Sequence, residues 1–288
     1  MSVIKSRHFP TKEFATKEAM FDEFRKSVDT IIELKKAEIQ KSCEKGLSVT
    51  CKSLDLLKFT DQIKGIKIDD NFYYIAVNTT RILDSHDDFH FDGLWGKSVK
   101  EQKGKNYLVT DHELCIDNVA VKKEYIEMFT AKLPFAMLGY DYEGETEALI
   151  YKVPKDKVIH EKAKQWLDSG DSIEASVRMQ YVVIEFAMDS NNPEDAESKK
   201  RYDYYYPMIA NKAEFEYIPY FFVIKEAKNV RESSLVVFGS NPVTGKVNST
   251  EPLKSTLDTD PPLEQSKSVW DNFISPQQSK SIWDDYLN

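Results

Sequence analysis

The sequence predicts a mainly β domain with flanking helices, an α+β fold. Residues 173–185 alternate between apolar and polar side chains, which is typical of a strand with one buried face. Residues 65–83 are rich in β-branched and aromatic residues, as strands are. Residues 11–45 carry apolar side chains at spacings of three and four among charges, which indicates an amphipathic helix. A chain of 288 residues can hold one sizeable domain with appendages.

We expect three parts along the chain. They are a helical arm over residues 1–65, a β-rich domain over residues 66–243 and a flexible tail over residues 244–288. The helix of the arm runs from Thr11 to about Lys45. It could be an arm that packs on the domain or on another protein; the favoured alternative is an ordinary packed helix. The tail is rich in Ser, Thr, Pro, Asp and Lys, which is typical of a flexible segment.

The β-rich domain begins with two predicted strands in residues 65–83, with a turn at residues 69–71 between them. An acidic segment follows, Asp84-Ser-His-Asp-Asp-Phe-His-Phe-Asp-Gly-Leu-Trp95. Its histidines, His86 and His90, raise the hypothesis of a metal-dependent hydrolase, because Asp and His bind several divalent ions. Their spacing matches no metal-binding loop, so an acidic turn that leaves a strand is the favoured interpretation.

Five further elements precede the alternating strand. Residues 107–121 have strand character, and His112 lies where their apolar run breaks. The pattern then predicts a helix over residues 122–132, a turn over 139–144, a strand over 147–153 and a helix over 155–168 that Pro154 opens and Ser169-Gly170 ends.

The alternating strand has one face that suits a core, formed by Ile173, Ala175, Val177, Met179 and Tyr181. Ser176 and Arg178 lie on the opposite, polar face, where a serine is a nucleophile only if a base activates it.

Beyond the alternating strand, we expect a polar surface loop over residues 189–201 and β structure over residues 202–206 and 215–224. Glu232 is expected to open a last strand, which ends at a Gly-Ser-Asn-Pro turn.

Charge and composition exclude several classes of function. The net charge of −9 argues against binding to nucleic acid phosphates. Three cysteines without Cys-x-x-Cys spacing favour neither a disulfide framework nor a zinc site, and they indicate a reducing compartment. No apolar run reaches the roughly 20 residues that cross a bilayer, and the N-terminus lacks the apolar core of a secretory signal.

The tail contains a short repeat. Gln265-Ser-Lys-Ser-Val-Trp-Asp-Asn-Phe-Ile274 is echoed by Gln278-Ser-Lys-Ser-Ile-Trp-Asp-Asp-Tyr-Leu287. Trp270 and Trp283 are large rigid side chains that could each anchor in a pocket of a partner, and two anchors on one tether gain avidity. The alternative is a duplication without function.

Four blocks in order resemble the prohead (capsid maturation) serine proteases of tailed phages. The family's first block has the form Asp-x-x-Gly-Asp followed by Gly-x-Phe, which Asp84, Asp88 and Gly93-Leu-Trp95 resemble, with Asp87 in place of the glycine. A histidine and a Ser-hydrophobic pair follow, here His112 and Ser176-Val177. The last block runs Glu-Val-Ser-Leu-Val-Thr-Phe-Pro-Ala-Asn, similar to Glu232-Ser-Ser-Leu-Val-Val-Phe-Gly-Ser-Asn241.

The resemblance covers about residues 66–243 and implies an active site. Ser176 would be the nucleophile, His112 the general base and Glu232 the acid that orients the imidazole. Arg178 would hold water or charge near the oxyanion, a role that backbone N–H groups more often supply. The resemblance implies no metal and no cofactor.

The resemblance also implies a fold and a biological role. The fold would be a compact, mostly antiparallel β-barrel flanked by helices, as in the related herpesvirus assemblins. The protein would be packaged in the phage procapsid, in the host cytoplasm, and would cut scaffold and capsid proteins and itself. This role is compatible with a homo-oligomer. The alternative is a catalytically silent, protease-like structural or scaffold-associated head protein.

Overall fold

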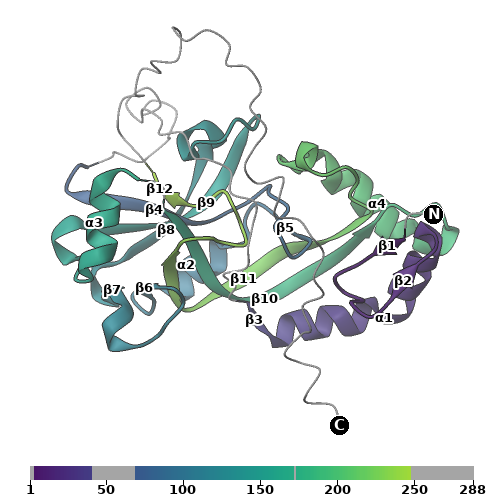
Figure 1. The fold of residues 1–288 in the computed structure, drawn as a ribbon, viewed down its shortest axis with the longest axis horizontal. Coiled ribbons are helices and arrows are strands. Elements are labelled where there is room, and N and C mark those ends of the chain that lie inside the picture. The colour runs from purple at the N-terminus through teal and green to yellow at the C-terminus, as the bar shows by residue number, and fades with distance from the viewer. Residues whose placement is uncertain (1–2, 41–68, 172, 248–288) are drawn as a thin grey trace, which may run out of the picture. The chain divides into compact units, whose positions relative to one another are not determined.

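Two long antiparallel strands, β10 (Glu174–Met188) and β11 (Tyr220–Val236), run through the middle of the structure in Figure 1. It is a computed structural model, which describes residues 3–40, 69–171 and 173–247. The alternation predicted for residues 173–185 is confirmed on its core side, because Ile173, Ala175, Val177, Met179 and Tyr181 are all buried in one apolar cluster. Beyond Tyr181 an irregularity in the β10–β11 pairing shifts the alternation by one residue, and Phe186 faces the same cluster.

The strands form three sheets. The largest has the order β3-β10-β11-β6-β7, with β5 also paired to β11, and its further members are β3 (Ile39–Gln40), β5 (Asp88–His90), β6 (Tyr107–Thr110) and β7 (Val119–Val121). The second has the order β12-β4-β9-β8, with β12 (Gly245–Lys246), β4 (Phe72–Thr79), β9 (Glu145–Pro154) and β8 (Glu127–Pro134). The third pairs β1 (Ile4–Lys5) with β2 (Glu13–Phe14).

This arrangement agrees with the α+β prediction at the coarse level and corrects it in detail. Most strand pairs are antiparallel, but β5 and β6 both run parallel to β11. Within residues 3–40, 69–171 and 173–247, the strands belong to separate sheets and close into no barrel.

In the described part of the chain, four α-helices flank the sheets: α1 (Lys17–Ala37), α2 (Gly96–Glu101), α3 (Glu161–Ser169) and α4 (Ala196–Tyr205). Short 3-10 turns lie at Ile116–Asn118, Lys123–Tyr125, Phe135–Leu138, Lys155–Lys157, Pro193–Asp195, Tyr206–Met208 and Lys212–Glu214. Of the helices in the described ranges, none combines the length and the apolar character that a membrane span requires.

Helix α1 packs on the β10–β11 pair, as the favoured alternative predicted. Phe24 is fully buried, with its ring 5.0 Å from that of Phe186 and 4.3 Å from that of Tyr220. The predicted start at Thr11 is six residues too early, because Thr16 caps the helix by accepting a hydrogen bond from the N–H of Ala19. The predicted end near Lys45 is too late, because the chain leaves the helix after Ala37 and pairs with β10 as β3.

The opposite side of the pair is covered by α4, where the sequence predicted a loop over residues 189–201 and β structure over 202–206. Both predictions are wrong. Asn192 and Pro193 start a helical turn that continues into α4. This helix buries only Tyr202 and Tyr205, against Ala187 and Phe221, and exposes its charges, so its sequence lacks a helical apolar stripe.

Three other predictions need correction. The helix expected over 122–132 is strand β8, paired along its whole length with β9. In residues 69–83 there is one strand, β4, while residues 65–68 lie outside the described ranges. The helix expected over 155–168 begins as a 3-10 turn and becomes α-helical only at Glu161. The strand over 147–153 and the helix stop at Gly170 are confirmed.

The ordered domain continues past the predicted boundary at residue 243. Strand β12 pairs with β4, and Val247 is buried. Gly245 has φ +118 and lies so close to the carbonyl of Ile173 that a Cβ would meet its oxygen at 2.1 Å, so only glycine fits there. The Trp repeats, with Trp270 and Trp283, lie outside the described residues.

Candidate active site

Ser176 and Glu232 lie on one face of the β10–β11 pair. Ser176 is directly opposite Ser234 in the antiparallel register, so both side chains point to the same side. Glu232 precedes Ser234 by two residues in a regular stretch of β11, where residues 232–235 pair with β6, and therefore shares that side. The other side belongs to the apolar core, through Ala175, Val177 and Leu235.

A bulge in β11 precedes Glu232. Val177 pairs with Ser233 and Met179 with Asn229, so Arg178 alone opposes the residues from Val230 to Glu232. Arg231 in this bulge has a φ of 71°, in the left-handed region. Bulges of this kind redirect a side chain and are frequent beside active sites. The prediction that Glu232 opens a strand is wrong, because Glu232 lies inside β11. It directly follows the bulge, at the start of the regular segment that pairs with β6.

His112 lies in a tight turn at the end of β6. Asp111 and His112 have φ values of 53° and 58°, and Glu113 N–H donates to the carbonyl of Thr110 at 3.1 Å. Two consecutive left-handed residues form the central pair of a type I′ turn, and Asp and His tolerate this conformation better than most residues. Asp111 N–H also donates to the carbonyl of Leu235 at 3.1 Å, which ties the turn to β11.

The turn brings His112 onto Glu232. Nδ1 of His112 lies 2.9 Å from Oε1 of Glu232, and the side chains are 5% and 0% exposed. An ionised carboxylate only accepts hydrogen bonds, so Nδ1 carries the proton in this contact. The neutral ring then presents Nε2 as an acceptor, and Nε2 is buried without a hydrogen-bond partner in the described residues. The contact expected between His112 Nδ1 and a Glu232 oxygen is thus present.

Ser176 lies beside this pair without a hydrogen bond to it. It is 7% exposed, and among the described residues its hydroxyl has no hydrogen-bond partner. The strand register therefore puts Ser176 on the same face as Glu232, next to the strand that carries it, but no hydrogen bond joins Ser176 to His112. Such bonds between a nucleophile and its base are often long without substrate.

Arg178 is also on this face, two residues from Ser176. Its Nε is buried and lacks a hydrogen-bond partner within the described ranges. Arg178 therefore lies near Ser176 on β10, as the strand alternation predicted. Its Nε makes no hydrogen bond to His112 or Glu232.

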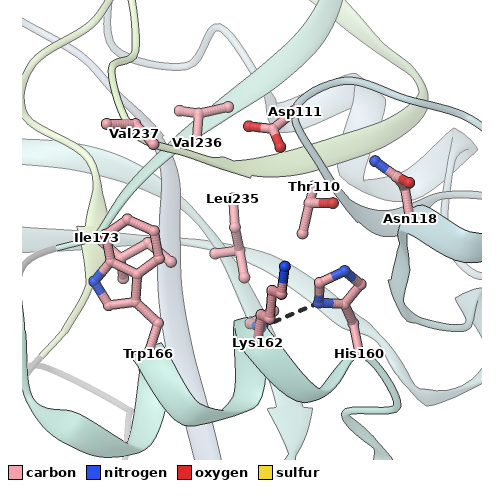
Figure 2. Close-up of a pocket in the computed structure, with 11 residues that line it drawn as sticks. Thr110, Asp111, Asn118, His160, Lys162, Trp166, Ile173, Leu235, Val236 and Val237 are labelled. Carbon is pink, nitrogen blue, oxygen red and sulfur yellow. Dashed lines mark hydrogen bonds between the residues drawn. The ribbon is translucent and has the colours of Figure 1, made fainter.

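Two surface hollows flank the His112 turn. The first has a volume of about 260 Å³, and Figure 2 shows Leu235, Ile173 and Trp166 at its apolar wall and Asp111 at its rim. Leu235 and Ile173 belong to the core side of the sheet, so this hollow lies across the sheet from Ser176. The second, of about 360 Å³, is lined partly by Leu114 and Ile116, which closely follow His112 and are 41% and 91% exposed.

The acidic segment forms a different group of histidines and carboxylates. Asp84 accepts hydrogen bonds from the backbone N–H groups of His86 and Asp88, and its Oδ2 lies 3.6 Å from His86 Nδ1 and 3.9 Å from His90 Nε2. Asp88 is fully buried, 2.6 Å from Lys35 Nζ and 2.8 Å from the hydroxyl of Tyr181. We call Asp84, His86, Asp88 and His90 with Lys35 and Tyr181 the acidic-turn cluster.

Several pKa values in the acidic-turn cluster are displaced. Burial raises the pKa of Asp84, but hydrogen bonding and charge from His86 and His90 outweigh it and lower the pKa to about 2. Burial, reinforced by Asp84, raises the pKa of Asp88 although Lys35 opposes this. Burial lowers the pKa of His90.

Nowhere in residues 3–40, 69–171 and 173–247 do three His, Cys, Asp or Glu side chains converge in an arrangement that could hold a metal ion. A chelating site from His86, His90 and Asp84 is therefore not formed in this conformation, although the sequence had raised it. The turn near Asp84 is tied instead to α1 through Lys35, which fits the structural interpretation.

Sequence reasoning missed two residues that organise these groups. Ser234 accepts a hydrogen bond from the backbone N–H of His112 at 2.9 Å. Its position two residues after Glu232 was a usable signal, because it puts both on one strand face. Lys35 pairs with Asp88 across 53 positions of sequence, and no local pattern signals such a contact.

No protein-family model, no curated protein and no solved structure matches this chain.

Proposed function

We propose that this chain is a serine endopeptidase of a tailed phage that matures the prohead by cutting scaffold and capsid proteins and itself. The observation that carries the proposal is the buried 2.9 Å contact between His112 Nδ1 and Glu232 Oε1, with Nε2 unpaired and Ser176 on the same strand face. A carboxylate that fixes the imidazole tautomer and an Nε2 that no other group occupies are what a general base for serine requires.

In the proposed reaction, Ser176 attacks the scissile carbonyl while His112 Nε2 takes its proton. Glu232 stabilises the imidazolium that forms, and His112 then returns the proton to the leaving amine. Arg178, whose Nε has no partner in the described part of the chain, could order water or negative charge beside the reacting carbonyl. The exposed Leu114 and Ile116, next to the His112 turn, offer an apolar surface to an extended substrate.

The proposal keeps the arm over residues 1–65 and the start of the protease at residue 66, but it extends the protease past residue 243 to include β12 and Val247. It places the protein in the procapsid interior, without a cofactor, and docks it to scaffold or capsid protein through Trp270 and Trp283. The double substitution Trp270→Ala with Trp283→Ala should reduce co-purification with those proteins, and each single one should reduce it less. Unchanged co-purification of the double variant would remove the docking role from the tail.

A Ser176→Ala variant tests the enzymatic part. Co-expressed with the phage's scaffold and capsid proteins, it should leave them uncut, because the neighbouring hydroxyl, that of Ser234, is engaged in hydrogen bonds. The fold should persist, since Ser176 lies on the polar face and its loss opens no apolar cavity. Cleavage at the wild-type rate by the variant would end the assignment of Ser176.

The alternative is a protease-like domain without activity that serves as a structural head protein. It predicts no cleavage by wild type and no labelling of Ser176 by a fluorophosphonate. The contact between His112 and Glu232, with Ser176 on the same strand face as Glu232, favours the enzyme, because a domain kept only for its shape does not require these three residue types together.

A further inference from the structure

Ser234 occupies the point where the His112 turn meets the central strands. Its Oγ accepts from the backbone N–H of His112 at 2.9 Å and lies 3.3 Å from the carbonyl oxygen of Val109 and 3.2 Å from that of Leu235. The hydroxyl thus receives one N–H and donates its own hydrogen to the carbonyls beside it. It connects β6, β11 and the turn through a single buried side chain, which is 0% exposed.

The His112 turn needs such a connection. Two consecutive residues in the left-handed region cost energy, and such a conformation persists only where surrounding contacts hold it. The turn is held by Glu113 N–H on Thr110, by Asp111 N–H on Leu235 and by the hydroxyl of Ser234 on His112 N–H. Of these contacts, the one from Ser234 is the only one made by a side chain, so it can be removed by substitution.

We infer that Ser234 is a positioning residue, whose hydroxyl fixes the backbone of His112 so that Nδ1 meets Glu232 and Nε2 faces the side of Ser176. This inference rests on the proposed protease function for its catalytic consequence, but the positioning itself concerns His112 alone. Ser234 and Glu232 hold the residue from two sides: Ser234 fixes its main chain and Glu232 its ring.

Ser234 is not a second candidate nucleophile. Its hydroxyl is fully buried and engaged by a backbone N–H, whereas that of Ser176 lies at a 7% exposed position and has no partner among the described residues. Ser176, which pairs with Ser234 in the antiparallel register, is therefore the serine that stays available for attack.

The chain offers a matched control in the preceding residue. Ser233 is also 0% exposed and on β11, but it points to the other side, where its hydroxyl meets the amide of Asn229 at 3.2 Å. Ser233→Ala and Ser234→Ala remove the same atom from the same strand. Only the second removes a contact to His112.

The experiment uses full-length protein with nitrogen-15-labelled histidine. The chain has five histidines, and a His112→Asn variant assigns the His112 signals. Wild type should show the nitrogen shifts of the Nδ1–H tautomer and a downfield, slowly exchanging Nδ1 proton. Ser234→Ala should lose that proton signal through fast exchange with water. Ser233→Ala should keep it.

A second readout reports on the serine. A fluorophosphonate forms a bond between its phosphorus and Ser176 Oγ, fluoride leaves, and the hydroxyl proton passes to His112 Nε2. We expect Ser234→Ala to label about 100-fold more slowly, the size of effect that a small misplacement of a catalytic group can have. Ser233→Ala should label at the wild-type rate. Circular dichroism checks that each variant is folded.

Ser234→Cys is a second variant, because it keeps a side-chain atom at the γ position but sulfur is a weak acceptor. If Ser234→Ala does not fold, the cysteine variant decides, and loss of the Nδ1 proton signal supports the positioning role. Retention of the signal and of labelling in a folded Ser234 variant overturns it, as does an equal loss in Ser233→Ala. If the signal is lost on substitution but wild type never labels, Ser234 positions His112 and the protease proposal fails.

Discussion

Two groups of residues in this molecule are built from the same side-chain types, histidines and carboxylates, but differ in their hydrogen-bond and ion-pair partners. In the candidate active site, His112 meets one carboxylate and keeps Nε2 without a partner in the described part of the chain. In the acidic-turn cluster, Asp84 faces two histidines, and Asp88 is enclosed by Lys35 and Tyr181. In the first group Ser176 shares a strand face with Glu232, and in the second the carboxylates are paired with Lys35 and the histidines.

The difference shows that residue type alone does not separate catalytic from structural groups. Both groups are buried, and the acidic-turn cluster has more ionisable residues, with displaced pKa values at Asp84, Asp88 and His90. Perturbed pKa values are common at active sites, but structural ion pairs perturb them as well. An unsatisfied histidine nitrogen does not separate the two groups either, because Nε2 of His90 also lacks a hydrogen-bond partner in the described residues. The distinguishing feature is the Ser176 hydroxyl, which shares a strand face with Glu232 outside the apolar core.

The largest effect is expected at Glu232. Glu232→Gln should reduce kcat by about 10⁴-fold, because an amide at this position also favours the wrong imidazole tautomer. The matched control is Glu226→Gln, which also lies on β11 but pairs with Lys97 at 3.3 Å, so its loss should change kcat little. Cleavage kinetics on a scaffold-derived substrate provide the measurement. If Glu226→Gln lowers kcat more than Glu232→Gln does, Glu232 is the wrong choice of carboxylate.

A smaller effect, on stability instead of activity, is expected at Lys35. Lys35→Met removes the partner of a fully buried carboxylate, and such losses cost about 3 kcal/mol of unfolding free energy. Urea unfolding should show this loss, while the folded fraction should cleave substrate at the wild-type rate. Lys26→Met is the control, since Lys26 is exposed on the same helix and its change should stay within about 0.5 kcal/mol. A loss of kcat in folded Lys35→Met protein would mean that the acidic-turn cluster affects the candidate active site.

The smallest effect is a pH dependence at His86. Burial lowers the pKa of His86, but Asp84 outweighs burial through a hydrogen bond and charge and raises that pKa above its ordinary value. A raised histidine pKa stabilises the fold fully below the unfolded pKa, about 6.5, and this contribution is lost as pH rises through the folded pKa. His86→Gln should therefore lower the melting temperature more at about pH 5.5 than at about pH 8.5.

An equal loss at both pH values would mean that His86 contributes no charge to the acidic-turn cluster. His112→Gln, with cleavage activity measured at the same two pH values, sharpens the contrast. The proposed role of His112 requires this activity to fall at both.

The sequence was sufficient for the local features that depend on side-chain periodicity and turn chemistry. The two faces of residues 173–181, the strand over 147–153 and the helix stop at Gly170 follow from alternation and from glycine at a left-handed position. The same information put Ser176 and Arg178 on the polar face, whereas His112 and Glu232 became a candidate pair only through the resemblance to the prohead proteases.

Only the tertiary structure decided the features that depend on distant partners. Residues 127–134 became β8 because β9 supplied a full set of hydrogen bonds, and residues 196–205 became α4 because two tyrosines fitted against β10 and β11. The bulge before Glu232, the support of the His112 turn by Ser234 and the pairing of Lys35 with Asp88 join residues far apart in the chain. Such contacts arise from three-dimensional packing, which no period of 2 or 3.6 residues encodes.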